Sequence, residues 1–524
     1  MWKNLDTCKS FADLQKARKP NIAELLTGTD AADRVAAYSI PMPAGMRYNY
    51  AAKQVDEAVL TILQSLADEQ QLIEKYKRLL DGEEVNTGEN RKVLHQLARG
   101  QLGKDVLYNG KNMRTFYIEQ LDKVRHFSEA IHSGKITAPS GKPFTDVVQI
   151  GIGGSDLGPR ALYLALRSWA EKQGKVKLNA HFISNVDPDD TAAVLSALQL
   201  ETTLFILVSK SGTTLETLTN ERFVNQFLVK KGLNPAKQMI AVTSETSPLA
   251  NNPCYLASFY MDDFIGGRYS SSSACGAAVL SLAFGAGVFQ DFLNGAAAAD
   301  RQALQPNIRE NAALLDALIG VYERNVLGYT ATAVLPYSQA LSRFPAHLQQ
   351  LDMESNGKSV NRFGEPISYK TGPVIFGEPG TNGQHSFYQL LHQGTDIIPL
   401  QFVGFTESQL GEDITVEDST SQQKLLANVT AQIAAFACGK NDSDANKAFA
   451  GGRPSGLIHG KALTPETLGV LLAHFENKVM FQGFLWNINS FDQEGVQLGK
   501  VLAKKVLSHD MPPALATYAR LFDL

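Results

Sequence analysis

The strongest constraint on the fold is a change of hydrophobic pattern near residue 145, where short apolar runs begin to alternate with longer helical patterns. Apolar runs of strand length lie at 147–152, 180–184, 204–208 and 239–243. Helical patterns separate them at 158–170, 190–198 and 214–228. Strands that alternate with helices form βαβ units, whose strands join into a parallel sheet with helices on both faces. The pattern therefore predicts an α/β fold with a doubly wound, mostly parallel sheet.

A second region of the same kind follows a Gly- and Ala-rich passage at 276–299 and a helical stretch that runs to about residue 327. Strand-like runs lie at 331–335, 373–376 and 397–403, and helical patterns lie at 344–354, 385–392, 421–438 and 466–484. The apolar stretch 274–289 is interrupted by Ser281 and fits a helix packed inside a domain better than a membrane span. A chain of 524 residues is too long for one ordinary core, so we expect two domains.

The first hundred residues have helical patterns at 55–80 and 92–102, which predict an α-helical arm. We accordingly divide the chain into four parts. They are a helical N-terminal arm at 1–120 that packs with the second domain, a first α/β domain at 121–290 that binds phosphate, a second α/β domain at 291–505, and a C-terminal tail at 506–524.

Composition excludes several classes of protein. Apolar residues make up 44% and charged residues 19% of the chain, which is the composition of a folded globular protein. The formal net charge is −4 without long runs of one sign, so neither nucleic acid nor an anionic membrane is expected as a partner. The polar N-terminus does not resemble a signal peptide, and no apolar run is long enough to span a membrane. We therefore expect a cytoplasmic protein.

Neither the cysteines nor the histidines indicate a metal site or a disulfide framework. The four cysteines are widely scattered and have no Cys-x-x-Cys spacing, so we interpret them as reduced thiols. On a helix, His385 and His392 would lie about 10 Å apart along the axis, which is too far to share one ion.

The stretch after the apolar run at 204–208 is rich in hydroxyl side chains and is typical of an anion site. Hydroxyls come from Ser209, Ser211, Thr213 and Thr214, while Gly212 allows close backbone approach and Lys210 adds charge. A helix that begins here would direct its free backbone N–H groups and the positive end of its dipole at the same point. The alternative is an ordinary Ser/Thr-rich turn. The Gly-x-x-x-x-Gly-Lys spacing of a nucleotide loop is absent, which favours a phosphorylated metabolite over ATP.

A second loop, at 151–160, closes the first predicted strand and opens a helix. Its backbone N–H groups and the Ser155 hydroxyl can face a ligand outside the strand ends. A dinucleotide site is the alternative, but the glycines stand at 151, 153, 154 and 158, which does not match Gly-x-Gly-x-x-Gly. This mismatch disfavours NAD.

Two candidate catalytic residues follow in isolated motifs. Arg268 stands after a glycine pair and before a Ser-rich helix start, where a permanent cation could stabilise an oxyanion. Glu354 ends a helical stretch just before Asn356-Gly357 and could act as a general base. The alternatives are a surface arginine in a loop and a solvated glutamate.

His385 and Lys500 complete the set. The pattern at 385–392 places His385 near a helix N-terminus, where the dipole would keep an imidazole neutral and able to relay a proton. A helix-capping or packed histidine is the alternative. Lys500 follows a small polar turn and indicates little by itself.

Together, in their order along the chain between residues 151 and 500, these segments resemble the glucose-6-phosphate isomerase (phosphoglucose isomerase) family. The resemblance implies two sugar-isomerase-type (SIS-type) α/β domains, a homodimer, and no metal or cofactor. It also implies reversible isomerisation of D-glucose 6-phosphate and D-fructose 6-phosphate through ring opening and a cis-enediolate intermediate.

The resemblance also implies residue roles. Glu354 resembles the base that moves a proton between C1 and C2, Arg268 the cation that stabilises the enediolate, and His385 and Lys500 the ring-opening residues. Further substrate contacts are implied for Ser209, Lys210, Ser211, Thr214, Gly154, Ser155, Gln350 and Gln493. In this family the histidine that matches His385 reaches into the active site of the partner subunit.

Two departures from the family pattern are visible. Ser271 and Ser272 stand where many relatives carry bulky apolar residues, and Glu494 stands where a tryptophan is common. These departures bear on local packing and substrate affinity. Two alternative functions remain: a non-catalytic regulator that binds phosphosugars, and an isomerase of a related phosphosugar. Retention of Glu354, Arg268, His385 and Lys500 in one chain favours catalysis.

Overall fold

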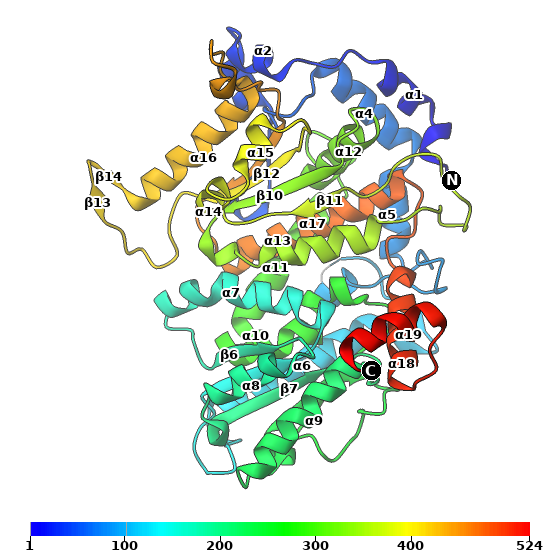
Figure 1. Ribbon diagram of the computed structural model, residues 1–524, viewed down its shortest axis with the longest axis vertical. Coiled ribbons are helices and arrows are strands. Elements are labelled where there is room, and N and C mark those ends of the chain that lie inside the picture. The colour runs from blue at the N-terminus through cyan, green and yellow to red at the C-terminus, as the bar shows by residue number, and fades with distance from the viewer. Residues whose placement is uncertain (1, 101) are drawn as a thin grey trace.

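The computed structural model describes residues 2–100 and 102–524 and confirms the predicted α/β fold. The chain forms two large, separate sheets that lie at opposite ends of an elongated molecule, with helices packed around both (Figure 1). No helix in the described ranges is long and apolar enough to cross a membrane.

The first sheet is wholly parallel and has the strand order β6-β5-β7-β8-β9. Its strands are β5 (Asp146–Ile150), β6 (Asn179–Ile183), β7 (Thr203–Val208), β8 (Met239–Ser244) and β9 (Ser258–Met261). The first four coincide with the predicted runs. The strand order reverses between β5 and β7, and ligands of open parallel sheets bind at the carboxyl ends of strands at such a switch point. Both predicted binding loops follow these two strands.

The central strand β7 shows why this sheet could be predicted. Every residue of β7 is buried, because helices cover both faces of the sheet. Leu204, Ile206 and Val208 enter the large core, which contains side chains of the helices at 157–172 and 274–284. Phe205 and Leu207 enter a separate cluster with side chains of the helices at 188–196 and 215–230. A strand buried on both faces has a continuous apolar run as its sequence pattern.

The helices around the first sheet also lie close to the predicted positions. They are α7 (Leu157–Lys172), α8 (Pro188–Ser196), α9 (Leu215–Lys230) and α10 (Ala274–Phe284), whereas α6 (Met113–His132) was not predicted. The apolar stretch 274–289, predicted as one helix, is interrupted. Gly285 has a φ of +94°, which ends α10 and starts α11 (Ala286–Gln302).

The second sheet is mixed and has the order β1-β2-β15-β12-β10-β11. Its parallel strands are β10 (Ala331–Tyr337), β11 (Val374–Phe376), β12 (Leu400–Phe405) and β15 (Ser455–Gly460). Two short strands of the N-terminal arm, β1 (Ser39–Pro41) and β2 (Arg47–Asn49), extend it antiparallel at the β15 edge. The arm therefore is not wholly helical as predicted, since three-residue strands are too short to show an alternating pattern.

The rest of the arm is mainly helical and packs on helices of the second half of the chain, with α2 (Ile22–Thr27) against α16 (Ser421–Cys438) and α4 (Glu57–Glu69) against α12 (Ala312–Asn325). Its helices are α1 (Lys9–Lys16), α2 (Ile22–Thr27), α3 (Ala31–Ala37), α4 (Glu57–Glu69) and α5 (Leu72–Leu80), followed by a hairpin of β3 (Leu107–Tyr108) and β4 (Lys111–Asn112). The helix predicted at 92–102 is wrong. Among the residues described there, only Leu97–Arg99 form a 3-10 turn, and Gln101 lies outside the described residues.

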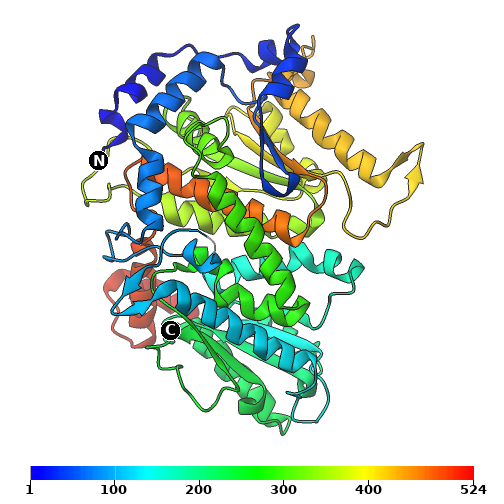
Figure 2. The same cartoon turned by 180° about the vertical axis from the view of Figure 1, so that it is seen from behind.

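Among the helices of the second half of the chain, α17 (Pro465–Leu485) is buried on almost every side, packs mainly against α11 and α12, and lies between the two sheets in both views (Figure 2). The others are α12 (Ala312–Asn325), α13 (Phe344–Gln349), α14 (Gly380–Gln384), α15 (Tyr388–Gln393), α16 (Ser421–Cys438), α18 (Gln497–Leu507) and α19 (Pro513–Ala519). A short hairpin of β13 (Thr415–Val416) and β14 (Ser419–Thr420) projects from the molecule beside α16 (Figure 1).

Candidate functional site

The predicted phosphate loop lies between β7 and α9, as the sequence indicated. Thr214 is the residue that precedes α9, so the positive end of that helix faces the loop. The Ser209 Oγ accepts a hydrogen bond from the Gly212 N–H at 3.1 Å and donates to the Thr214 Oγ1 at 3.4 Å. Gly212 has a φ of +66°, which a glycine adopts without strain. Ser211 is exposed, and its Oγ accepts hydrogen bonds from the Thr213 N–H at 3.2 Å and the Thr213 hydroxyl at 3.0 Å.

Lys210 ties this loop to the segment that carries Arg268. Its Nζ donates to the Ile265 backbone oxygen at 3.2 Å and lies 3.7 Å from the Asp263 carboxylate. Burial lowers the pKa of Lys210, and the negative charge of Asp263 opposes that shift. The phosphate loop and the Arg268 segment are thus neighbours.

The loop after β5 contacts the same segment. A Cβ on Gly154 would collide with the backbone of Gly267, so only glycine permits this approach. A side chain on Gly158 would meet the Ser271 hydroxyl in the same way. The first glycine-rich loop therefore serves the close packing of two backbones as well as any ligand. Ser155 is partly exposed, and its backbone oxygen accepts a hydrogen bond from the Gln149 side chain at 2.7 Å.

Arg268 is buried and not the surface arginine of the alternative interpretation. It lies in a 3-10 turn, Gly267–Ser272, and its guanidinium donates hydrogen bonds from all three nitrogens. The Nε donates to the Ser355 Oγ at 2.7 Å, and Nη1 donates to the Glu354 Oε1 at 3.2 Å and the Gln493 Oε1 at 3.0 Å. The Nη2 donates to the backbone oxygens of Ser490 at 2.6 Å and Asp492 at 2.9 Å. These five bonds match the five N–H donors of an arginine.

Glu354 ends a π-helical turn, Gln350–Glu354, that continues α13. Such turns are rare in proteins, and those that occur often lie at functional sites. Hydrogen bonds of the residues that follow Glu354 anchor this segment to the protein interior. The Asn356 Nδ2 donates to the Val479 oxygen at 3.2 Å, and its Oδ1 accepts from the Ser490 Oγ at 2.7 Å. The base candidate therefore sits on a well-anchored segment, with its side chain 22% exposed.

A cleft of about 770 Å³ lies beside Glu354 and is lined by three of the predicted site residues, Gln350, Glu354 and Gln493. Glu494, one of the departures from the family pattern, lines it too. The volume is within the range of clefts that accept a small metabolite. Arg268 is not itself among the residues that line this cleft, but both acceptors of its Nη1, Glu354 and Gln493, line it.

Sequence reasoning missed the ion pair that closes one side of this cleft. The Lys358 Nζ lies 2.9 Å from the Asp492 Oδ1 and donates to the Glu354 backbone oxygen at 3.1 Å. Burial lowers the pKa of Lys358, and the Asp492 carboxylate opposes that shift. Both residues adjoin predicted motifs, but the 134 positions between them leave no local signal of their pairing.

His385 and Lys500 are placed apart from this cleft. Both are exposed, and neither is among the residues that line the cleft. The helix N-terminus predicted at His385 is wrong. His385 follows the last residue of α14, and α15 begins only at Tyr388, so the dipole argument does not apply. Lys500 lies on α18.

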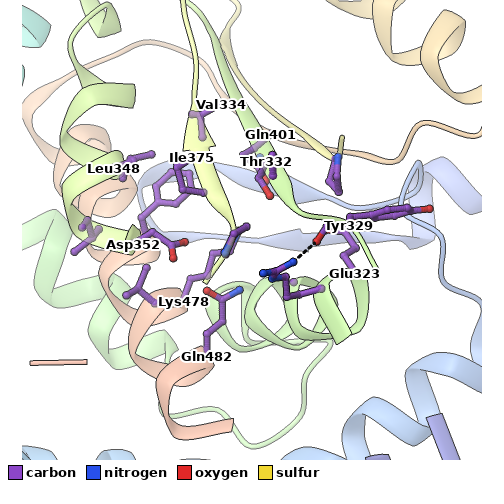
Figure 3. Close-up of a pocket in the computed structure, with 18 of the residues that line it drawn as sticks. Glu323, Tyr329, Thr332, Val334, Leu348, Asp352, Ile375, Gln401, Lys478 and Gln482 are labelled. Carbon is purple, nitrogen blue, oxygen red and sulfur yellow. Dashed lines mark hydrogen bonds between the residues drawn. The ribbon is translucent and has the colours of Figure 1, made fainter. Parts of the chain in front are cut away.

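A second, much smaller cavity lies on the other side of the π-helical turn. It has a volume of about 30 Å³ and is enclosed by α12, α17 and the second sheet (Figure 3). Asp352 points into it together with Lys478, Gln401 and Gln482 (Figure 3). Burial raises the pKa of Asp352 to about 7, although the Lys478 charge and the Asn356 side chain oppose the shift. One turn thus directs Glu354 to the open cleft and Asp352 to the interior.

Comparison with known proteins gives one consistent result. The family model described as phosphoglucose isomerase matches residues 49–517. The chain is 68% identical to the glucose-6-phosphate isomerase of Treponema denticola and 65% identical to that of Treponema pallidum, over 98% or more of each chain. The crystal structure of a glucose-6-phosphate isomerase from Chlamydia trachomatis has a TM-score of 0.92 and 42% identity, with 99% of both chains covered.

Proposed function

The chain belongs to the phosphoglucose isomerase family, and from this premise we propose how its own residues perform the isomerisation. The protein is a glucose-6-phosphate isomerase, which interconverts D-glucose 6-phosphate and D-fructose 6-phosphate reversibly. The reaction needs a group that opens the sugar ring, one base that serves both C1 and C2, and a cation for the enediolate oxygens.

Glu354 is the base in this proposal and Arg268 is the cation. The observation that carries it is the 3.2 Å contact between the Arg268 Nη1 and the Glu354 Oε1 at the wall of the cleft. A proton removed from C2 by Glu354 leaves negative charge on the neighbouring oxygens. Arg268 cannot lose its proton and holds a fixed orientation, so it is suited to stabilise that charge.

The phosphate group of the substrate binds to the loop after β7. Ser209, Lys210, Ser211 and Thr214 surround the N-terminus of α9, where backbone N–H groups and the helix dipole favour an anion. Gly154, Ser155, Gln350 and Gln493 contact the sugar. The close packing of Gly154 on Gly267 and the position of Gln350 and Gln493 in the cleft support this assignment.

His385 and Lys500 open the ring, and the active sites are shared between two subunits of a homodimer. The support for sharing is the exposed position of His385 outside the cleft that Glu354 lines. In this arrangement, His385 of one subunit completes the cleft of the partner subunit. A cytoplasmic location, expected from the sequence, remains a prediction.

The direct experiment follows formation of fructose 6-phosphate from glucose 6-phosphate by purified protein, with a chelator present and no cofactor added. We expect full activity, and Glu354→Gln should abolish nearly all of it. Product formation by the Glu354→Gln variant at the wild-type rate would contradict the assignment of the base.

A further inference from the structure

We propose that Ser355 is a positioning residue for the isomerisation: its hydroxyl fixes the guanidinium of Arg268 beside Glu354, and the Tyr269 hydroxyl in turn fixes Ser355. This inference rests on the proposed roles of Arg268 and Glu354 and adds two residues to the machinery. Neither residue touches the cleft.

The contacts of the Ser355 hydroxyl carry the proposal. Its Oγ accepts from the Arg268 Nε at 2.7 Å and lies 2.9 Å from the Tyr269 hydroxyl oxygen. Ser355, Arg268 and Tyr269 are all buried, with exposed fractions of 0%, 1% and 1%. Water therefore does not reach these groups from outside to replace a lost partner, and an unpaired guanidinium N–H would be costly.

The hydroxyl joins two parts of the molecule that meet at the cleft. Arg268 belongs to the turn that follows the first sheet, whereas Ser355 follows the π-helical turn of the second sheet region. Arg268 therefore contacts two consecutive residues, with Nη1 on the Glu354 side chain and Nε on the Ser355 side chain. This double contact sets the distance between the cation and the base.

The roles of the three guanidinium nitrogens are different. The acceptors of Nη1 are side chains that line the cleft, so this nitrogen can exchange them for substrate oxygens. The acceptors of Nη2 are backbone oxygens of the 490–492 segment. The Nε contact with Ser355 is thus the bond to the Glu354 segment that persists when Nη1 turns to the substrate.

Tyr269 is itself held in place. Its ring stacks on the buried His95 ring with a centroid distance of 4.6 Å and contacts Phe491 at 5.7 Å. Rotation of the Tyr269 ring away from Ser355 would disturb both contacts. The tyrosine hydroxyl therefore offers the Ser355 hydroxyl one fixed partner.

Steady-state kinetics of Ser355→Ala test the proposal. We expect kcat to fall about 10- to 100-fold while KM stays within about twofold, because Arg268 acts on charge that develops only in the transition state. Tyr269→Phe, which keeps the ring and its stacking, should lower kcat by a smaller factor. Ser272→Ala is the matched control. Ser272 is equally buried and lies in the same turn as Arg268, but its hydroxyl has no partner among the described residues, so kcat should not change.

Epistasis with Arg268→Lys separates positioning from general damage to the fold. A lysine has no Nε–H to donate to Ser355, so Ser355→Ala and Tyr269→Phe should have little further effect on kcat in the Arg268→Lys background. Full multiplication of the two losses would overturn the proposal, as would an unchanged kcat in Ser355→Ala. If Ser355→Ala does not fold, the Tyr269→Phe pair gives the same test.

The same set of variants also distinguishes this inference from the function it rests on. If Arg268→Lys leaves kcat unchanged, the proposed role of Arg268 is wrong. If Arg268→Lys lowers kcat and neither Ser355→Ala nor Tyr269→Phe does, only the positioning role is wrong.

Discussion

The two halves of the proposed active site differ in how the fold holds them. Arg268 and Glu354 meet inside one chain, with the guanidinium buried and bonded through every N–H. His385 and Lys500 are exposed and lie outside the cleft. Under the proposed function, the groups for proton transfer between carbons are preorganised in the single chain, whereas His385 acts in the site of a second copy.

Glu354→Gln should have the largest effect, because it removes the base from the preorganised half while keeping its size. We expect kcat to fall about 10²- to 10⁴-fold with little change in KM. The assay is steady-state kinetics together with exchange of the C2 proton with solvent. Glu494→Gln, a glutamate that lines the same cleft, is the matched control and should keep far more activity. Wild-type exchange in Glu354→Gln would show that another group is the base.

His385→Ala tests the exposed half and should have the next largest effect. We expect isomerisation of the closed-ring substrate to fall about 10²-fold, at the lower end for general acid–base groups, because sugar rings also open unaided in water. The thermal midpoint should stay unchanged, since an exposed side chain is lost. Ser386→Ala, its exposed neighbour, is the control. Full activity of His385→Ala would place ring opening elsewhere.

Ser211→Glu tests whether the loop before α9 binds the phosphate group of the substrate, in the ground state and the transition state alike. The added carboxylate would lie in the loop before α9 and repel the phosphate dianion in the ground state and the transition state equally. We therefore expect KM to rise about tenfold or more with kcat little changed. Ser196→Glu, an exposed serine on α8, is the charge-matched control. An unchanged KM in Ser211→Glu would show that phosphate binds at another site.

Asp352→Asn should have the smallest effect on activity and sharpens the contrast between the two sides of the π-helical turn. Burial raises the pKa of Asp352 to about 7 from 3.8, so between these pH values the folded state holds a proton that the unfolded state has released. The wild type therefore loses stability through this group as pH rises from about 4 to about 7.

The asparagine variant cannot ionise, so its stability should depend less on pH over that range. The free energy of unfolding of the variant minus that of the wild type should be about 1 to 4 kcal/mol larger at pH 7.5 than at pH 4. Urea unfolding at several pH values measures this, and isomerase activity should change less than about threefold. Parallel stability curves for the two proteins would mean that Asp352 does not titrate in this range.

The sequence predicted the fold best where burial alone determines the pattern. Strands β5, β7 and β8 are apolar runs buried on both faces, and each was located within two residues of its ends. Strand β15 was missed because Ser455–Gly460 contains two glycines and a histidine, which are poor strand signals. Strands β1 and β2 were missed because their stability comes from pairing with each other and with β15.

The candidate residues were found through their motifs, but their arrangement was not predictable. The bonds of Arg268 lead to residues 354, 355, 490, 492 and 493, which lie 86 to 225 positions away in the chain. The prediction of a helix that begins near His385 was wrong because tertiary packing determines where the helices of this segment lie. The segment Gly380–Gln384 forms α14 despite its two glycines, and a side chain on Gly380 would collide with the Tyr337 ring. Packing there overrides local helix propensity.

Subunit exchange between two inactive variants tests the shared site most directly. Glu354→Gln homodimers lack the base in both sites, and His385→Ala homodimers lack the histidine in both. In a mixed dimer with shared sites, one site carries both lesions, whereas the other combines the intact Glu354 of one chain with the intact His385 of the other.

Mixing the two variants should therefore restore activity with time, towards one competent site per mixed dimer, on the slow timescale of subunit exchange. Native mass spectrometry with one chain isotope-labelled measures the fraction of mixed dimers in the same samples. Activity that rises in proportion to that fraction is the predicted result. Mixed dimers that form without any return of activity would show that His385 serves its own chain, which contradicts the shared site.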